Sequence, residues 1–240
     1  QRQRTGLGVQ ERVEQALGAV ADEPVEVTCA GRTDTGVHAS GQVAHFDTDA
    51  ERSERGWLLG ANTNLPDDIC VTWVKLVDDE FHARYSAIAR RYHYRILNRL
   101  VRSALYRHRA WWVHQALDHR RMHDAAQALV GEHDFSAFRA AGCQASNALR
   151  EITEIGVERE GDWIVLDVMA NAFLQHMVRN ITGTLAAIGS GEEDIDWAAR
   201  VLEGRDRTRA GMAAPPHGLT LVRVYYPDAF DIPVPFELGQ

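Results

Sequence analysis

The amino-acid sequence predicts a chain with both helices and strands in each half. Apolar residues recur at helical spacing in residues 9–21 and 173–191, and they alternate with polar residues in 25–29 and 89–98. No repeat with a period of roughly 20 to 50 residues is visible, which argues against a repeat array. At 240 residues, 45% of them hydrophobic, the chain can bury a core as one large domain or two small ones.

The other elements follow the same two patterns along the chain. Asp118 is a suitable N-cap for a helix that Gly131 would end, and Gly161 would join two strands into a hairpin. Residues 59–68 predict a short helical turn. Further strands are expected at 43–46, 69–77, 149–159, 162–170 and 214–227, and further helices at 118–131 and 195–204.

Composition excludes several classes of protein. No apolar run is long enough to span a bilayer, and no signal peptide is recognisable. The three cysteines, Cys29, Cys70 and Cys143, are far apart and lack C-x-x-C spacing, which argues against a disulfide framework or a structural zinc site. His176 precedes Met177, but no second ligand stands four residues on, so a metal site is not expected there either. A reducing, cytoplasmic compartment fits best.

The charge distribution suggests a polyanionic partner. The net charge is −8, yet residues 81–117 contain no Asp or Glu. An acid-free basic segment in an acidic chain is typical of a phosphate-binding surface. Its arginines are Arg84, Arg90, Arg91, Arg95, Arg99, Arg102, Arg107 and Arg109.

A polar loop between two strand patterns is the best candidate for a site. Gly31 and Gly36 flank Arg32 and Asp34, and His38 follows. Functional residues concentrate on loops that rigid elements hold. An arginine near an aspartate favours the ionised carboxylate and orients it. A hairpin with a surface ion pair would show the same residue pattern.

The complete string around this loop is more specific. Residues 31–46, GRTDTGVHASGQVAHF, resemble the signature of the tRNA pseudouridine synthase A (TruA) family. Further similar blocks occur in the family's order: RRYHY at 90–94, HDFSAF at 133–138, FLQHMVRN at 173–180, and residues 214–226. Members of that family carry a strand with a Tyr-Asp-Gly segment before the Q-R-Q that opens this sequence. We therefore expect the natural protein to have that strand.

The resemblance implies a fold, a reaction and partners. The fold class would be α+β, a pseudouridine synthase fold in which two α+β halves share one mainly antiparallel sheet with a central cleft. The halves would be residues 1–84, with the aspartate loop, and residues 85–240. The activity would be isomerisation of uridine to pseudouridine at uridines 38 to 40 of the tRNA anticodon stem-loop, by a homodimer without a cofactor. Missing metal-ligand and phosphate-loop motifs agree with that chemistry.

The same resemblance suggests catalytic residues. Asp34 would be the nucleophile, or would remove a ribose proton, and the sequence does not distinguish attack at the ribose from attack at the base. Arg32 and Arg179 would hold its carboxylate. Tyr92 would pack against the extruded target base and could accept its C5 proton.

Four further residues are expected to contact the substrate. Leu219 belongs to the closing strand that lines the floor of the pocket in the family. His38, Arg90 and Arg91 are the polar candidates.

Two other functions fit parts of this pattern. A non-catalytic RNA-binding module would use the same arginines and aromatic residues, but it would not need Arg32, Asp34 and Arg179 together. A hydrolase using Asp34 and His38 would add water to its product, whereas isomerisation leaves the product mass unchanged.

Overall fold

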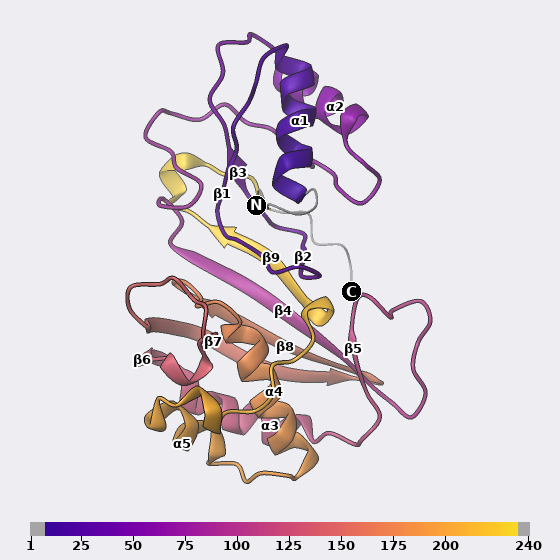
Figure 1. Cartoon of the computed structure of the whole chain (residues 1–240), viewed down its shortest axis with the longest axis vertical. Coiled ribbons are helices and arrows are strands. Elements are labelled where there is room, and N and C mark those ends of the chain that lie inside the picture. The colour runs from indigo at the N-terminus through magenta and orange to yellow at the C-terminus, as the bar shows by residue number, and fades with distance from the viewer. Residues whose placement is uncertain (1–7, 235–240) are drawn as a thin grey trace. The chain divides into compact units, whose positions relative to one another are not determined.

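The computed structural model describes residues 8–234 as two compact units, each made of segments that are separate in sequence (Figure 1). Unit 1 combines the segment that ends at Arg32, Gln42–Ile88 and the segment from Tyr225 onward. Unit 2 combines Thr33–Gly41 with Ala89–Val224. The division expected from the sequence, residues 1–84 and 85–240, stays a prediction.

Unit 1 is a pair of helices packed on short strands. Gln10 and Glu14 hydrogen-bond the Val27 backbone, which ties the first helix to the residue that precedes the first strand. Its elements are α1 (Val9–Ala21), β1 (Thr28–Cys29), β3 (Ala44–His45) and α2 (Glu54–Asn64). The two strands pair antiparallel.

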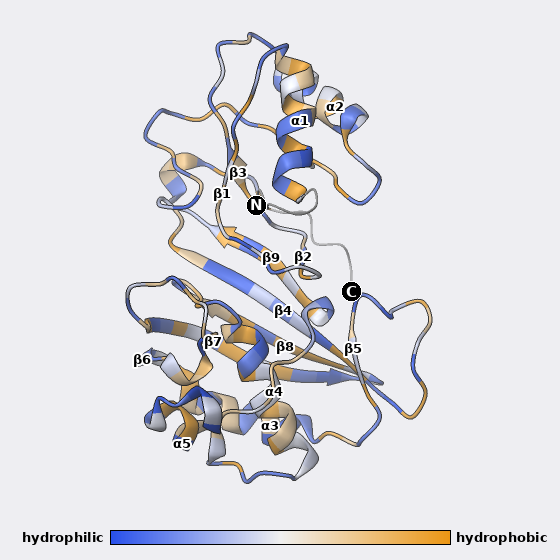
Figure 2. Cartoon of the chain, in the orientation of Figure 1, coloured by the Kyte–Doolittle hydropathy of each residue, from blue (hydrophilic) through white to orange (hydrophobic). Residues whose placement is uncertain are grey.

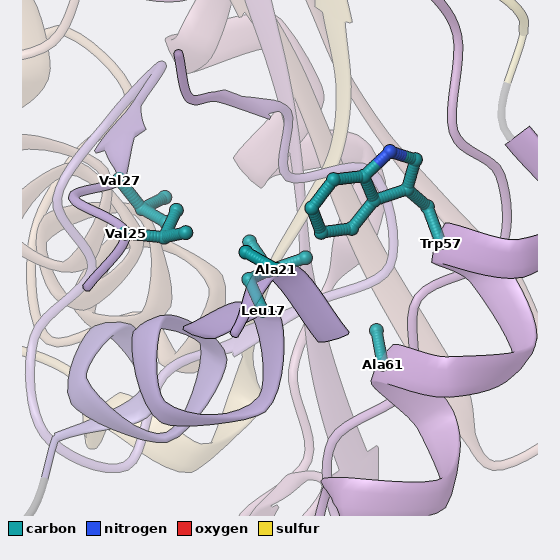
Figure 3. Packing of buried hydrophobic residues seen from close by; sticks show 6 residues of the cluster. All are labelled: Leu17, Ala21, Val25, Val27, Trp57 and Ala61. Carbon is teal, nitrogen blue, oxygen red and sulfur yellow. The ribbon is translucent and has the colours of Figure 1, made fainter. Parts of the chain in front are cut away.

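The apolar stripe of α1 forms the core of this unit. Figure 2 shows apolar and polar residues interspersed along α1, as an amphipathic helix requires. The apolar side chains meet Trp57 of α2, which is 6% exposed. The cluster in Figure 3 comprises Leu17, Ala21, Val25, Val27, Trp57 and Ala61.

Unit 2 is built on a seven-stranded sheet in the order β2-β9-β4-β8-β7-β6, with β5 also paired to β4. The pairs β4–β8, β8–β7 and β7–β6 are antiparallel, whereas β2–β9 and β4–β5 are parallel. The strands are β2 (His38–Ala39), β4 (Ala89–Asn98), β5 (Trp111–Val113), β6 (Gly131–Asp134), β7 (Leu149–Glu160), β8 (Trp163–Ala170) and β9 (Leu219–Tyr225).

Three helices complete unit 2: α3 (His119–Ala126), α4 (Met177–Ser190) and α5 (Trp197–Gly204). Helices α3 and α4 pack on each other and against the sheet (Figure 1). Alternate residues of β4 and β8 face this core, which explains the period-two pattern in the sequence. They include Tyr92, Tyr94, Ile96, Ile164, Leu166 and Val168.

The mixed α+β class and the mainly antiparallel sheet are confirmed. Within residues 8–234, however, the strands form two sheets instead of the one shared sheet expected. Residues 69–77 do not form the predicted strand. The Asn62 side chain bonds both the N–H and the carbonyl of Val71, at 2.8 and 2.7 Å, and so takes the place of a strand partner.

Candidate active site

Asp34 lies at the start of a tight turn. The Val37 N–H donates a hydrogen bond to the Asp34 carbonyl oxygen at 3.0 Å. Gly36, inside this turn, has φ +84°, a left-handed conformation that favours glycine. The turn leads directly into β2, so the sheet of unit 2 fixes the position of the aspartate.

The Asp34 carboxylate is paired with two side chains from the start of α4. Arg179 Nη1 lies 3.0 Å from Asp34 Oδ2, and His176 Nε2 lies 3.3 Å from the same oxygen. The N-terminal end of a helix also favours negative charge. About a quarter of the Asp34 side chain (26%) is exposed, so the carboxylate is partly accessible from solvent.

Arg179 is held by more than this ion pair. Its Nε donates to the Ala214 carbonyl at 2.8 Å, and the Ala214 N–H donates to the Arg179 carbonyl at 3.0 Å. The planar guanidinium can bond Ala214 and Asp34 at once. The segment around Ala214 therefore orients the arginine for the aspartate.

That segment crosses α4 at very short range. A Cβ added to Gly183 of α4 would lie 1.7 Å from the Met212 carbonyl oxygen. The Gly211 N–H donates to Thr184 Oγ1 at 3.0 Å. Only glycine at position 183 permits this crossing, which brings Ala214 to Arg179.

Two aromatic residues of β4 lie in the core of unit 2. Tyr92 is 8% exposed and packs edge-on against Phe173, with ring centroids 5.0 Å apart. Phe173 belongs to the segment that leads to His176. The Tyr94 hydroxyl donates to the Pro215 carbonyl at 2.7 Å, and burial strongly raises its pKa.

His38 and Leu219 lie on neighbouring strands. His38 is opposite Thr220 in the β2–β9 register, and Leu219 is 6% exposed at the start of β9. One ring nitrogen of His38 lies 2.6 Å from the His108 carbonyl oxygen. Burial lowers the pKa of nearby His217; His108 and His38 lower it further, while the Ala110 backbone acts in the opposite direction.

The arginines expected to contact the substrate have partners within unit 2. Arg90 donates to the Asn171 carbonyl at 3.0 Å. Arg91 bonds Asp167 through Nε and Nη2, and its Nη1 lies 3.2 Å from Glu154. Their role as substrate contacts stays a prediction.

The structure thus brings Asp34, Arg179 and His176 together. Arg32 belongs to unit 1, so its role stays a prediction. The sequence analysis considered His176 only as a metal ligand and missed its place beside Asp34. Its spacing from Arg179, three residues along a helix start, was the available signal.

Neither a metal-binding cluster nor a helix able to cross a membrane occurs within residues 8–234. All three cysteines are free.

Comparison with known proteins identifies the class. The family model described as tRNA pseudouridine synthase matches residues 1–86 and 125–227. The chain belongs to this family, whose members are isomerases.

Its relatives define the group more narrowly. The chain is similar to proteins named tRNA pseudouridine synthase A: one from Pseudoalteromonas atlantica is 55% identical, over 97% of this chain and 89% of the relative. One from Coxiella burnetii is 56% identical over 94% and 86%. One from Stenotrophomonas maltophilia is 54% identical over 97% and 91%. The resemblance of the GRTD loop to the TruA family is therefore confirmed.

Proposed function

We propose that this protein isomerises uridine to pseudouridine in tRNA, at uridines 38 to 40 of the anticodon stem-loop. The observation that carries the proposal is the partly exposed Asp34 carboxylate of the GRTD loop, paired with Arg179. The names of its relatives support tRNA as the substrate. We further propose that the protein acts in the cytoplasm as a homodimer without a cofactor.

The reaction makes and breaks one bond at the ribose. The bond between ribose C1′ and base N1 breaks, the base turns, and C1′ bonds to C5. The C5 proton leaves and N1 takes one up, so atoms balance without an oxidant or a group donor. Asp34 supplies the electron pair that starts the sequence, by attack on ribose or base or by removal of a ribose proton.

In this proposal, other residues orient the Asp34 carboxylate, contact the base or bind the RNA. Arg179 and Arg32 orient the carboxylate. Tyr92 packs against the extruded base and accepts the C5 proton, and Leu219 lines the pocket. His38, Arg90 and Arg91 contact the RNA, and the acid-free segment 81–117 binds its phosphates, contacts that position the RNA without reading its sequence.

Release of tritium from C5-tritiated uridine in tRNA tests the proposal. We expect release by the wild type and none by Asp34→Ala, with tRNA binding retained in the variant. Absence of release by the wild type would leave an RNA-binding module as the better explanation. Equal release by both proteins would show that Asp34 is not the catalytic residue.

The same samples test the hydrolase alternative. Hydrolysis adds water to the product, whereas isomerisation leaves the mass of the RNA unchanged. Within residues 8–234 the Asp34 carboxylate is paired with Arg179 and His176 and not with His38, which supports isomerisation over a hydrolase that uses Asp34 and His38.

A further inference from the structure

The two partners of Asp34 converge on a single carboxylate oxygen. Arg179 Nη1 and His176 Nε2 approach Oδ2 at 3.0 and 3.3 Å. Within residues 8–234, no hydrogen bond or ion pair reaches Oδ1. The two oxygens of this carboxylate therefore differ in their surroundings.

The backbone of His176 is shaped for this contact. It has φ +62°, which is uncommon outside glycine, and it stands at the N-cap of α4. The Asn180 N–H donates to its carbonyl at 2.9 Å, so helical bonding begins at this residue. Strained conformations of this kind concentrate at functional sites. Here the bend places the imidazole and the Arg179 guanidinium on the same side of the helix start.

We propose that His176 is a positioning residue for Asp34: together with Arg179 it holds Oδ2, and it thereby leaves Oδ1 as the oxygen that acts on the substrate. The inference rests on the proposed function, in which Asp34 starts the reaction. It applies to each of the three possible routes, because each needs an electron pair on one carboxylate oxygen. The guanidinium donates a hydrogen bond to Oδ2 and the imidazole lies 3.3 Å from the same oxygen, so both contacts fall on Oδ2 while Oδ1 stays available.

His176 has a second possible role, which the experiment must separate from the first. It could serve only to start α4 with a left-handed residue. Asparagine tolerates positive φ, but its side chain is too short to place a donor at Oδ2. Glutamine reaches about as far as the histidine Nε2. Glycine adopts this φ without strain and leaves space for free imidazole.

The test compares His176→Asn, His176→Gln and His176→Gly with wild type in single-turnover tritium release from C5-tritiated tRNA. We expect the Asn and Gly variants to react roughly 10- to 100-fold more slowly, because the carboxylate loses its orientation. Their tRNA dissociation constants should equal that of the wild type. Glutamine, or added imidazole with the Gly variant, should restore most of the rate. His119→Asn, at the start of α3, is the control histidine and should react at the wild-type rate.

Each outcome decides the question. Absence of release by the wild type would overturn the proposed function itself. With an active wild type, a rate within two-fold in both the Asn and the Gly variant would overturn the positioning role and leave a helix-start role. Slow variants that neither glutamine nor imidazole rescues would also overturn it. Because glycine fits the backbone at this position, the test stands even if the Asn variant fails to fold.

Discussion

Arg179 makes its two contacts through two different nitrogens of one rigid plane. Its Nε bonds the Ala214 carbonyl while its Nη1 bonds Asp34, and its side chain is only 13% exposed. A lysine has a single nitrogen on a flexible stem, so it lacks the fixed spacing between Nε and Nη1 that orients the carboxylate relative to the carbonyl. The arginine therefore sets the direction of the carboxylate as well as its charge.

We expect Arg179→Lys to lower the single-turnover rate about 100-fold, a loss that misplacement of a catalytic group by about 1 Å can cause. The melting temperature should change little in comparison. Arg200→Lys is the matched control, because Arg200 pairs with Asp194 on an exposed surface. An unchanged rate in Arg179→Lys would show that charge alone is needed. The measurement is tritium release at saturating enzyme.

At the residue scale, the sequence analysis predicted Asp34 and Arg179 as catalytic residues but did not predict the contact between His176 and Asp34. The first two stand in motif strings that resemble a known family. The importance of His176 depends on a positive φ and on a partner 142 residues away in the sequence, Asp34. Neither spacing nor composition reveals such a contact, because tertiary packing creates it.

At the scale of elements, helix α4 and the segment that crosses it at Gly183 together position Arg179. Gly183 lets the Met212 carbonyl approach the helix, and this approach brings Ala214 to Arg179. The helical period of residues 173–191 predicted the helix but not this contact. The helix itself begins only at Met177, because His176 leaves the right-handed conformation.

We expect Gly183→Ala to destabilise the protein by at least about 1–3 kcal/mol, the usual cost of overpacking, although alanine is the better helix former. The rate of tritium release should also fall, because Ala214 must move. Gly204→Ala in α5 is the control, since a Cβ there has nothing within 4 Å. Chemical denaturation of both variants measures the difference. Equal stability of the two would contradict the close crossing.

The strand predictions also show that a local sequence pattern does not decide which contacts form. Residues 89–98 alternate and form β4, whereas residues 69–77 alternate and do not form a strand. The two segments differ in what their backbones hydrogen-bond to. β4 pairs with β8 over eight positions, but Val71 is bonded by the side chain of Asn62. Alternation indicates which face is buried, and only the fold decides whether a ladder forms.

At the scale of the whole molecule, each of the two units is assembled from segments that are not contiguous in the sequence. The Asp34 loop and β2 belong to the unit made mostly of residues 89–224, although β1 before them and β3 after them belong to the other. A sequence analysis that looks for one boundary cannot predict this arrangement. Local patterns identified the elements correctly in most places, because they depend on neighbours, whereas the assignment of segments to units depends on distant contacts.

Strands β4, β7 and β8 of unit 2 carry a cluster of charged side chains that should make the stability of the protein depend on pH. Burial alone would raise the pKa of Asp167, but hydrogen bonds and charges from His93 and Arg91 outweigh it and lower that pKa to about 2. The depressed pKa stabilises the folded state above the unfolded value near 3.8, and this contribution is lost as the pH falls from about 4 through 2.

Asp167→Asn should therefore cost roughly 1–2 kcal/mol of unfolding free energy at neutral pH, after allowance for partial solvent screening. The difference from wild type should shrink between pH 4 and pH 2. Asp162→Asn is the control: that side chain is 55% exposed, 3.6 Å from Arg99, so its ion pair contributes little. A difference that stays constant over this range would contradict the assignment. Urea titrations at several pH values measure it.

The acid-free segment 81–117 should make the affinity of the protein for tRNA depend on salt concentration. Arg102 and Arg109 are exposed on a chain of net charge −8. Each arginine that neutralises a phosphate releases a counterion, so the logarithm of tRNA affinity falls with the logarithm of salt concentration. The number of such contacts sets the slope.

We expect Arg102→Gln to weaken tRNA binding and to reduce this slope by about 0.7–0.9, the contribution of one phosphate contact. Arg200→Gln is the control for lost positive charge, because both terminal nitrogens of Arg200 bond Asp194, at 2.9 and 2.7 Å. The two variants have the same net charge, so only the position of the lost arginine differs. A slope that falls equally in both would assign the effect to net charge. A fall in Arg102→Gln alone would assign it to the acid-free segment, and binding titrations from 50 to 200 mM salt distinguish the two.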